Sequence, residues 1–352
     1  MNRKTTIERF KSDFGEIVTV EMINRRGASV KLSNLGAGIV AITVPDRYGR
    51  MADVVLGYDN PTDYMADGPC AGKVPGRYAN RIAKGLFTID GKEYQLAINN
   101  GPNALHGGPT GFQNRLWKME LSGADAVRFS RVSEDGEEGY PGRLEVAATY
   151  RWSDDNELSL TLEAQSDNAT VVNLTNHTYF NLAGHDAGTG LKQTLKLNAS
   201  RYLPTDETLI PTGEMAQVEG TPMDFRSAHE IGRDIKADFP ALNYGKGYDN
   251  CWVVDNYEPG QLRTVAELSD AESGRRLEVQ TDQPAAQVYT GNWLDGSPKG
   301  KGGCEYHDYD AVAIECQDMP DAPNKPEFPS TRLNPGDKYE RHIVFKFNTF
   351  GK

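Results

Sequence analysis

Hydrophobic and polar residues alternate with a period of two in runs that recur along this 352-residue chain. Successive side chains of a strand point to opposite faces, so the alternation predicts strands that bury one face. The clearest runs are LSLTL at 158–162, LEV at 277–279 and HIVFKF at 342–347. Turn-forming pairs separate the runs: DG at 90–91 and 135–136, PG at 141–142 and 335–336, and SG at 273–274.

Helical periodicity is scarce in the chain. Residues 227–240 predict one short helix, with Ser227 as N-cap and Glu230 three residues later in a capping-box pattern. Many strands with one apolar face indicate two stacked antiparallel sheets. We therefore predict an all-β protein, a large antiparallel β-sandwich that forms a single domain over residues 1–352.

The composition of the chain limits the kinds of molecule that it can bind. The formal net charge of -12 at pH 7 argues against binding to nucleic acid or to an anionic membrane surface, but not against a neutral ligand. The apolar runs are too short to span a membrane, and residues 1–15 lack the apolar segment of a secretory signal. We expect a cytoplasmic monomer or homodimer. Four widely spaced cysteines are expected to be reduced thiols: Cys70, Cys251, Cys304 and Cys316.

A polar stretch at 171–184, VVNLTNHTYFNLAG, carries one of only six histidines. Strand alternation over 176–182 would place His177, Tyr179 and Asn181 on one face. A histidine hydrogen-bonded inside a sheet gives the same pattern, so this stretch alone does not assign a function.

A glutamate stands in an apolar stretch near the C-terminus, DAVAIECQDMPDA at 310–322. Alternation places Glu315 and Gln317 opposite Val312, Ile314 and Cys316. A carboxylate in such surroundings is costly to desolvate, and its pKa would rise toward the range of a general base at neutral pH. The alternative is an exposed glutamate on an edge strand.

Further polar side chains lie on predicted strands or on loops at their ends. They are Gln287 and Tyr289 on a strand, Asn80 and Arg81 in a turn, His106 in a glycine-rich loop and Asp249 before an apolar strand. Each is compatible with an ordinary turn or polar face, but together these amides, acids and imidazoles suit a sugar. The chain lacks phosphate-binding GxxxxGK[ST] and GxGxxG loops, a GxSxG elbow and an HExxH helix.

These residues stand in long stretches that resemble the galactose mutarotase family, the aldose 1-epimerases. The stretches cover nearly the whole chain in this order: GRYANRIAKGLFTIDGKEYQL, NNGPNALHGG, GYPGRLEVAATY, NLTNHTYFNLAG, YLPTDETLIPTGE, PAAQVYTGNWL, AIECQDMPDAPN and FPSTRLNPGDKY. The resemblance implies a β-sandwich of the supersandwich type, with the sugar in an open cleft across one sheet.

The resemblance also implies roles for individual residues. His177 matches the family's general acid and Glu315 its general base, while His106 is expected to assist near the ring oxygen. Sugar-binding positions match Asn80, Arg81, His106, Asp249 and Gln287. Two departures stand out: the family often has His-Asn where this chain has Asn250 and Cys251, and Lys73-Val74-Pro75 replaces a commoner apolar sequence.

The implied reaction needs only an acid and a base. Glu315 would take the proton of the C1 hydroxyl while protonated His177 protonates the ring oxygen, which opens the ring, and reclosure after rotation gives the other anomer. No metal or cofactor is required, because the sugar carries its own electrophile. We expect neighbouring acids to keep His177 protonated, and hence a bell-shaped pH profile rather than a flat one between about pH 5 and pH 8.

Three other functions remain open on sequence grounds. A glycoside hydrolase or lyase would use two carboxylates, which Asp249 and Glu315 could supply. A non-catalytic sugar-binding module would bind without accelerating any reaction, and a hexose-phosphate epimerase would need more arginines than Arg81. The remaining histidines are expected to lie in loops or on the surface: His185, His229, His307 and His342.

Overall fold

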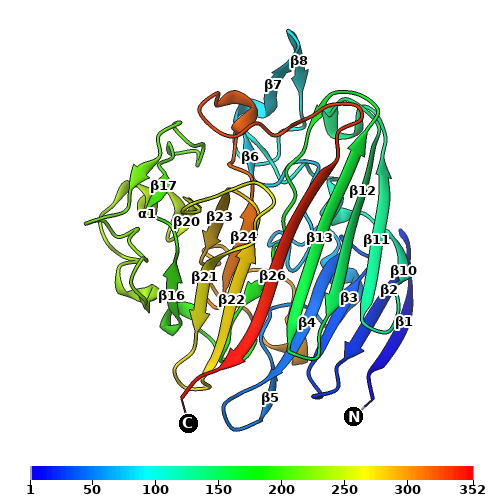
Figure 1. Cartoon of the computed structure of the whole chain (residues 1–352), viewed down its shortest axis with the longest axis vertical. Coiled ribbons are helices and arrows are strands. Elements are labelled where there is room, and N and C mark those ends of the chain that lie inside the picture. The colour runs from blue at the N-terminus through cyan, green and yellow to red at the C-terminus, as the bar shows by residue number, and fades with distance from the viewer. Residues whose placement is uncertain (1, 352) are drawn as a thin grey trace.

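A computed structural model describes residues 2–351, and antiparallel strands dominate it (Figure 1). The nine-stranded sheet has the order β10 (Lys118–Leu121), β11 (Ala126–Ser133), β12 (Leu144–Trp152), β13 (Glu157–Ser166), β26 (Tyr339–Thr349), β22 (Arg275–Thr281), β21 (Arg263–Ser269), β16 (Thr194–Leu197) and β19 (His229–Glu230). A five-stranded sheet has the order β1 (Lys4–Ser12), β2 (Gly15–Ile23), β3 (Ser29–Ser33), β4 (Gly38–Pro45) and β5 (Met51–Asp53).

The third large sheet carries most of the polar residues singled out above. Its six strands have the order β15 (Tyr179–Phe180), β24 (Val312–Gln317), β23 (Ala285–Tyr289), β20 (Asp249–Val253), β17 (Arg201–Leu203) and β18 (Ala216–Gln217). Three further pairs are β14 (Thr170–Val171) with β25 (Arg332–Leu333), β6 (Arg81–Ile82) with β9 (Ala104–Leu105), and β7 (Leu86–Ile89) with β8 (Lys92–Gln95).

Helices are short and few in the described residues. The only α-helix there is α1 (Pro240–Gly245), and the 3-10 helices are Pro61–Tyr64, Ala83–Gly85, Phe112–Asn114, Glu137–Gly139, Gly190–Lys192, Ile231–Arg233, Lys301–Gly303 and Ala322–Asn324. None of the described helices is long and apolar enough to cross a membrane. The predicted all-β architecture is confirmed.

One hydrophobic core joins the three large sheets. It takes inward side chains from the nine-stranded sheet, such as Leu160 and Phe345, and from the five-stranded sheet, such as Val30. The six-stranded sheet contributes Val288 and Ile314, so the opposite face of β23 and β24 is turned away from this core. That second face is where the alternation had placed Glu315 and Gln287.

The strands with the clearest alternation are confirmed. In β13, buried leucines alternate with partly exposed polar residues, and β22 shows the same alternation. The long strand β26 lies between them in the sheet (Figure 1). All four cysteines are free, as expected of reduced thiols.

The helix predicted over 227–240 is wrong. The segment forms the short strand β19 and the 3-10 helix Ile231–Arg233, and α1 begins only at Pro240. The ring of His229 stacks on Phe225 at 4.4 Å, and its two nitrogens contact the carbonyl groups of Asp224 and Glu230. These contacts hold the backbone extended where the capping box would need a helical turn, whereas the fixed φ of proline suits a first helical position.

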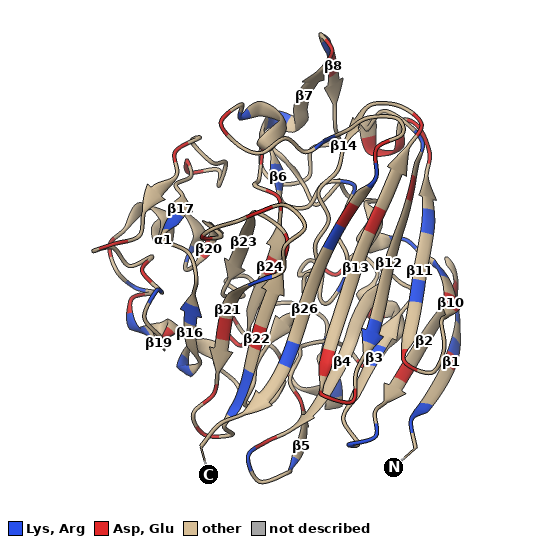
Figure 2. Cartoon of the chain, in the orientation of Figure 1, with Lys and Arg blue, Asp and Glu red and all other residues tan. Residues whose placement is uncertain are grey.

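Charged residues of both signs lie along the visible strands of the nine-stranded sheet (Figure 2). They pair across the strands, for example Arg128 with Glu163 at 2.8 Å and Lys338 with Glu163 at 3.0 Å. Exposed pairs of this kind contribute about 1 kcal/mol or less each.

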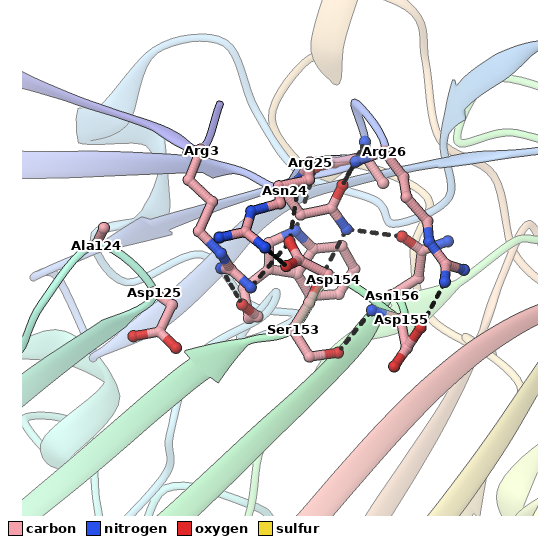
Figure 3. Close-up of polar contacts among 12 residues, drawn as sticks. Arg3, Asn24, Arg25, Arg26, Ala124, Asp125, Ser153, Asp154, Asp155 and Asn156 are labelled. Carbon is pink, nitrogen blue, oxygen red and sulfur yellow. Dashed lines mark hydrogen bonds and ion pairs between the residues drawn. The ribbon is translucent and has the colours of Figure 1, made fainter. Parts of the chain in front are cut away.

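Two turns at one end of the molecule are joined by a polar cluster (Figure 3). Asn24, after β2, is fully buried and donates to the carbonyl group of Ser153 at 3.0 Å and to Asn156 Oδ1 at 2.8 Å. Its own Oδ1 accepts from the backbone N–H groups of Arg26 and Ala28. One amide thus fastens the β2–β3 turn to the β12–β13 turn.

Asn24→Ala is expected to lower the free energy of unfolding by about 1–3 kcal/mol, because it leaves buried polar groups without partners. Urea unfolding followed by tryptophan fluorescence measures this loss. Arg26→Ala is the control, since Arg26 and Asp155 form an exposed pair with side chains 63% and 73% accessible, and it should cost less than about 1 kcal/mol. Equal losses in the two variants would contradict the role given to Asn24.

Candidate active site

A cleft of about 540 Å³ lies over the second face of the six-stranded sheet. Six of the seven residues proposed from the sequence line it, from β24, β20, β6 and the loops beside them: Asn80, Arg81, His106, His177, Asp249 and Glu315. The seventh, Gln287, lies directly behind Asp249 and donates to its Oδ1 at 2.7 Å. The predicted residues therefore gather at one place.

Strand register brings the sheet residues together. Gln287 on β23 pairs with Glu315 on β24 on one side and with Cys251 on β20 on the other. Asp249 pairs with Tyr289, so its carboxylate stands one diagonal step from Gln287. β24 lies between β15 and β23, so Glu315 is on an interior strand and the alternative of an edge-strand glutamate is wrong.

His177 reaches the cleft from a segment that is less regular than predicted. Only Tyr179 and Phe180 of the stretch 176–182 form a strand. His177 and Tyr179 do lie on one side, with ring centroids 5.0 Å apart. Asn181 instead donates to the carbonyl groups of Gly188 and Asp310, away from the cleft. The face predicted by alternation therefore holds for two of its three members.

The side chains of His177 and Glu315 approach each other inside the cleft. Nε2 of His177 lies 3.4 Å from Oε1 of Glu315, and the two side chains are only 6% and 2% exposed. Nδ1 of His177 and Oε2 of Glu315 have no hydrogen-bond partner within the described chain. A buried acid–base pair with unused polar atoms is prepared to bind a polar ligand.

Burial shifts both pKa values away from the charged forms. It lowers the pKa of His177 to about 4, and Lys73 acts in the same direction, while its own carbonyl group and Asp249 oppose the shift. Burial, reinforced by Asp249, raises the pKa of Glu315 well above its usual range, against the effect of Arg81. We expected neighbouring acids to keep His177 protonated. This expectation is wrong, because the effect of desolvation on the pKa of His177 is larger than the opposing effect of Asp249.

These two shifts act in the same sense: burial favours the state in which the pair carries one titratable proton between its two members. Adding a second proton would charge the imidazole beside a neutral acid, and removing the last proton would leave an isolated buried carboxylate. The single proton can sit on Glu315, or on His177 with Glu315 ionised. Both arrangements place a proton donor next to a proton acceptor.

His106 lies at the side of this pair. Its ring is perpendicular to that of His177, with centroids 5.3 Å apart, and its Nδ1 accepts from the backbone N–H of Asn80 at 3.1 Å. Burial, His177 and Arg81 lower the pKa of His106 well below its usual value. A neutral ring whose Nδ1 accepts must carry its proton on Nε2, so His106 is a hydrogen-bond donor to whatever binds.

A fixed polar network forms the other side of the cleft. Nη2 of Arg81 lies 3.4 Å from Oδ2 of Asp249, and Gln287 donates to the other carboxylate oxygen. Nε of Arg81 donates to Oδ1 of Asn100 at 3.0 Å. The guanidinium and the carboxylate are thereby oriented before a ligand arrives, which reduces the entropy lost on binding.

Three side chains of the cleft are close enough together to be considered as metal ligands. His106, His177 and Glu315 offer ligand atoms within 4.8 Å of one another. A metal needs the lone pair of an imidazole nitrogen, but the contact from Asn80 to Nδ1 of His106 puts a proton on its Nε2. The donor set therefore fits a hydrogen-bonding ligand better than a cation.

Sequence reasoning missed the rim of the cleft. Asn100 stands in the NNGPN stretch, and its place in a strand-end loop was the one available signal. Tyr244, Trp293 and the segment 207–209 come from distant parts of the chain, and only the fold brings them to the same opening. Trp293 is 62% exposed, so it is available to a bound ligand.

Comparison with known proteins agrees with this geometry. The family model for aldose 1-epimerase matches residues 18–346, which is almost the whole chain. The chain belongs to the aldose 1-epimerase family. Its fold is accordingly the galactose mutarotase-like β-sandwich predicted from the sequence motifs.

Individual relatives match most of the length of this chain. Galactose mutarotases of Bos taurus and Homo sapiens are each 47% identical over 319 residues, 91% of this chain and 91% of theirs. A crystal structure of an aldose epimerase homologue from C. elegans superposes with a TM-score of 0.87 at 33% identity, and covers 94% of this chain and 98% of its own.

The structure explains one of the two departures from the family pattern. Cys251 is buried beside Gln287 among Leu203, Val253 and Met319, beneath the cleft. Asn250 faces the opposite side of β20 and pairs with Val288. Neither residue lines the cleft.

Proposed function

We propose that this aldose 1-epimerase, an isomerase of sugars, interconverts the α and β anomers of free hexoses such as galactose and glucose without a cofactor. The observation that carries the assignment of roles is the 3.4 Å approach of His177 Nε2 to Glu315 Oε1 inside the cleft. The ring oxygen and the C1 hydroxyl of a sugar are attached to one carbon atom. The acid and the base that serve them must therefore lie side by side.

Glu315 in its ionised form takes the proton of the C1 hydroxyl while His177 gives its proton to the ring oxygen. The C1–O5 bond breaks, and the open-chain aldehyde is left with a protonated Glu315 and a neutral His177. Rotation about the C1–C2 bond presents the other face of the carbonyl group. On reclosure the two protons return by the same route, so the pair starts and ends with one proton.

The remaining residues bind and orient the sugar. Nε2–H of His106 donates near the ring oxygen, while Arg81, Asp249 and Asn80 bind hydroxyl groups, and Gln287 holds Asp249. The whole chain acts as one domain in this proposal. Galactose is the first substrate to test, because several relatives are galactose mutarotases.

Polarimetry tests the proposal. Freshly dissolved α-galactose and α-glucose should reach their equilibrium rotation faster in the presence of the protein, with a rate proportional to its concentration. A sugar that binds, by calorimetry, but mutarotates at the rate seen in buffer would favour a binding module instead. Release of phenol from aryl glycosides would favour a glycoside hydrolase.

Two features count against the alternative enzymes. Both oxygens of Asp249 are engaged, by Arg81 and by Gln287, so it is placed to orient a ligand rather than to act as a second catalytic carboxyl group. Arg81 is the one Lys or Arg side chain among the described residues that line the cleft, and it already faces Asp249. A phosphorylated sugar would lack a free cationic partner there.

The pH profile of kcat should show a broad plateau at neutral pH, which replaces the bell shape between about pH 5 and pH 8 expected from the sequence, because the pKa of His177 is lowered and that of Glu315 is raised. On the acid side activity falls as the one-proton pair gains a second proton, at a pH near the lowered pKa of His177, about 4. On the alkaline side it falls as the pair loses its proton, above the ordinary range of a carboxyl group because the pKa of Glu315 is raised. Initial rates measured from about pH 4 to pH 9 check this. A narrow maximum near the ordinary pKa of histidine would contradict the one-proton pair.

A further inference from the structure

Lys73 and Asp67 form an ion pair behind the wall of the cleft. Their side chains are 1% and 0% exposed. A buried charge pair is costly to assemble, so its presence here calls for a role beyond filling space.

Further hydrogen bonds hold both members of the pair. Nζ of Lys73 donates to the carbonyl oxygen of Tyr64 and, at 3.2 Å, to Oδ1 of Asn114. Oδ2 of Asp67 accepts from Tyr58 Oη at 3.2 Å and from the backbone N–H of Ala71 at 2.9 Å. The pair thereby ties the two ends of the segment 67–73 together.

This segment is the backbone support of His177. The N–H of His177 donates to the carbonyl oxygen of Lys73 at 2.9 Å, and the N–H of Gly72 donates to the carbonyl oxygen of His177 at 2.9 Å. The hydroxyl of Tyr179 donates to the carbonyl oxygen of Pro69 at 2.8 Å. The residue that carries the catalytic imidazole is therefore fixed to the loop that the ion pair closes.

His177 depends on this support more than a catalytic histidine usually does. A second group commonly binds the distal nitrogen of such a ring and fixes its orientation. No other residue of the described chain hydrogen-bonds Nδ1 of His177. Apart from the contact of Nε2 with Glu315, the described residues hold its ring by packing, from Tyr179, His106 and Tyr289.

We propose that the Asp67–Lys73 pair is a positioning device for His177, an inference that rests on the proposed function. The pair keeps the segment 67–73 rigid, and the segment keeps the imidazole at the distance from Glu315 that proton transfer to the ring oxygen requires. Binding of the sugar hydroxyls depends on Arg81 and Asp249 on the other side of the cleft. Loss of the pair therefore lowers kcat and leaves KM nearly unchanged.

The test compares two double variants. Asp67→Asn with Lys73→Met removes both charges and keeps side chains of similar size. Asp53→Asn with Lys301→Met is the control, because Lys301 and Asp53 form a second ion pair at 2.5 Å, with side chains 12% and 16% exposed. Lys301 also donates to the carbonyl groups of Val40 and Val55, and Asp53 accepts from the backbone N–H groups of Ile42 and Val55; none of these residues lines the cleft. Both variants are measured by polarimetry and by thermal unfolding.

In the first variant kcat should fall about tenfold or more with KM within about twofold of wild type, since small displacements of a catalytic group are costly. The control should lose comparable thermal stability and keep its kcat. The proposal is overturned if the first double variant folds and keeps wild-type kcat, or if kcat falls equally in both double variants.

If the first variant does not fold, Tyr58→Phe replaces it, because it removes a single hydrogen bond to Asp67. It should lower kcat about twofold to fivefold, and an unchanged kcat overturns the proposal. A wild-type protein that fails to accelerate mutarotation rejects the proposed function itself. The two failures are therefore distinguishable.

Discussion

Glu315→Gln is expected to lower kcat for mutarotation by about 10²–10⁴-fold, the usual contribution of a general base. Glutamine keeps the size of the side chain and its place between β15 and β23, but its amide cannot take up the proton of the C1 hydroxyl. Loss of the carboxylate also leaves His177 without the partner that shares its proton. KM should change little, because hydroxyl contacts from Arg81 and Asp249 remain.

The control for this substitution is Glu93→Gln on β8, where the carboxylate is exposed and remote from the cleft. It should keep wild-type kcat. Initial rates of mutarotation of α-galactose measure both variants. If Glu315→Gln retains more than about a tenth of wild-type activity, water or another group is the base and the assignment fails.

His177→Asn should cause a loss of similar size, about 10²–10⁴-fold in kcat. The ring oxygen of the sugar is a weak base, and without a proton donor the C1–O5 bond must break toward an unstabilised alkoxide. His106 cannot substitute, since its lowered pKa keeps it neutral and Asn80 fixes its ring. The fall of rate near pH 4 should disappear with His177.

His307→Asn is the matched control for the second substitution, because His307 is 65% exposed and pairs with Asp295 at the surface. Its kcat should equal that of wild type over the whole pH range. A His177→Asn protein that keeps an acid limb near pH 4 would show that another group carries that titration.

Much of the fold could be read from local patterns. Strands β13, β22 and β26 bury mainly one face, so hydrophobic and polar residues alternate along their sequences. This alternation can be recognised without any knowledge of the fold. The helix expected at 227–240 failed for the same reason that short patterns often fail. A tertiary contact, the antiparallel pairing of β19 with β16, prevails over a local capping preference.

The sequence was enough to propose which residues form the site, but not to predict their pKa values. The residues were proposed through motifs that resemble those of the aldose 1-epimerase family, and the structure brings them to one cleft. Pairing of β20, β23 and β24 in one register, which sets Asp249, Gln287 and Glu315 side by side, is a long-range property. The lowered pKa of His177 follows from its burial, which no local pattern of the sequence reveals.

Glu315 lies on an interior strand of a hydrogen-bonded sheet, whereas the rim of the cleft comes from loops. Substitutions in the sheet are therefore more disruptive than substitutions in the rim. Glu315 and Asp249 are held by the pairing of β24, β23 and β20, so moving one of them would require a change of register in the sheet. The opening above it is framed by side chains from separate loops, such as Tyr244 and Trp293. Changes in those loops would alter which sugars fit the cleft while His177 and Glu315 stay in place.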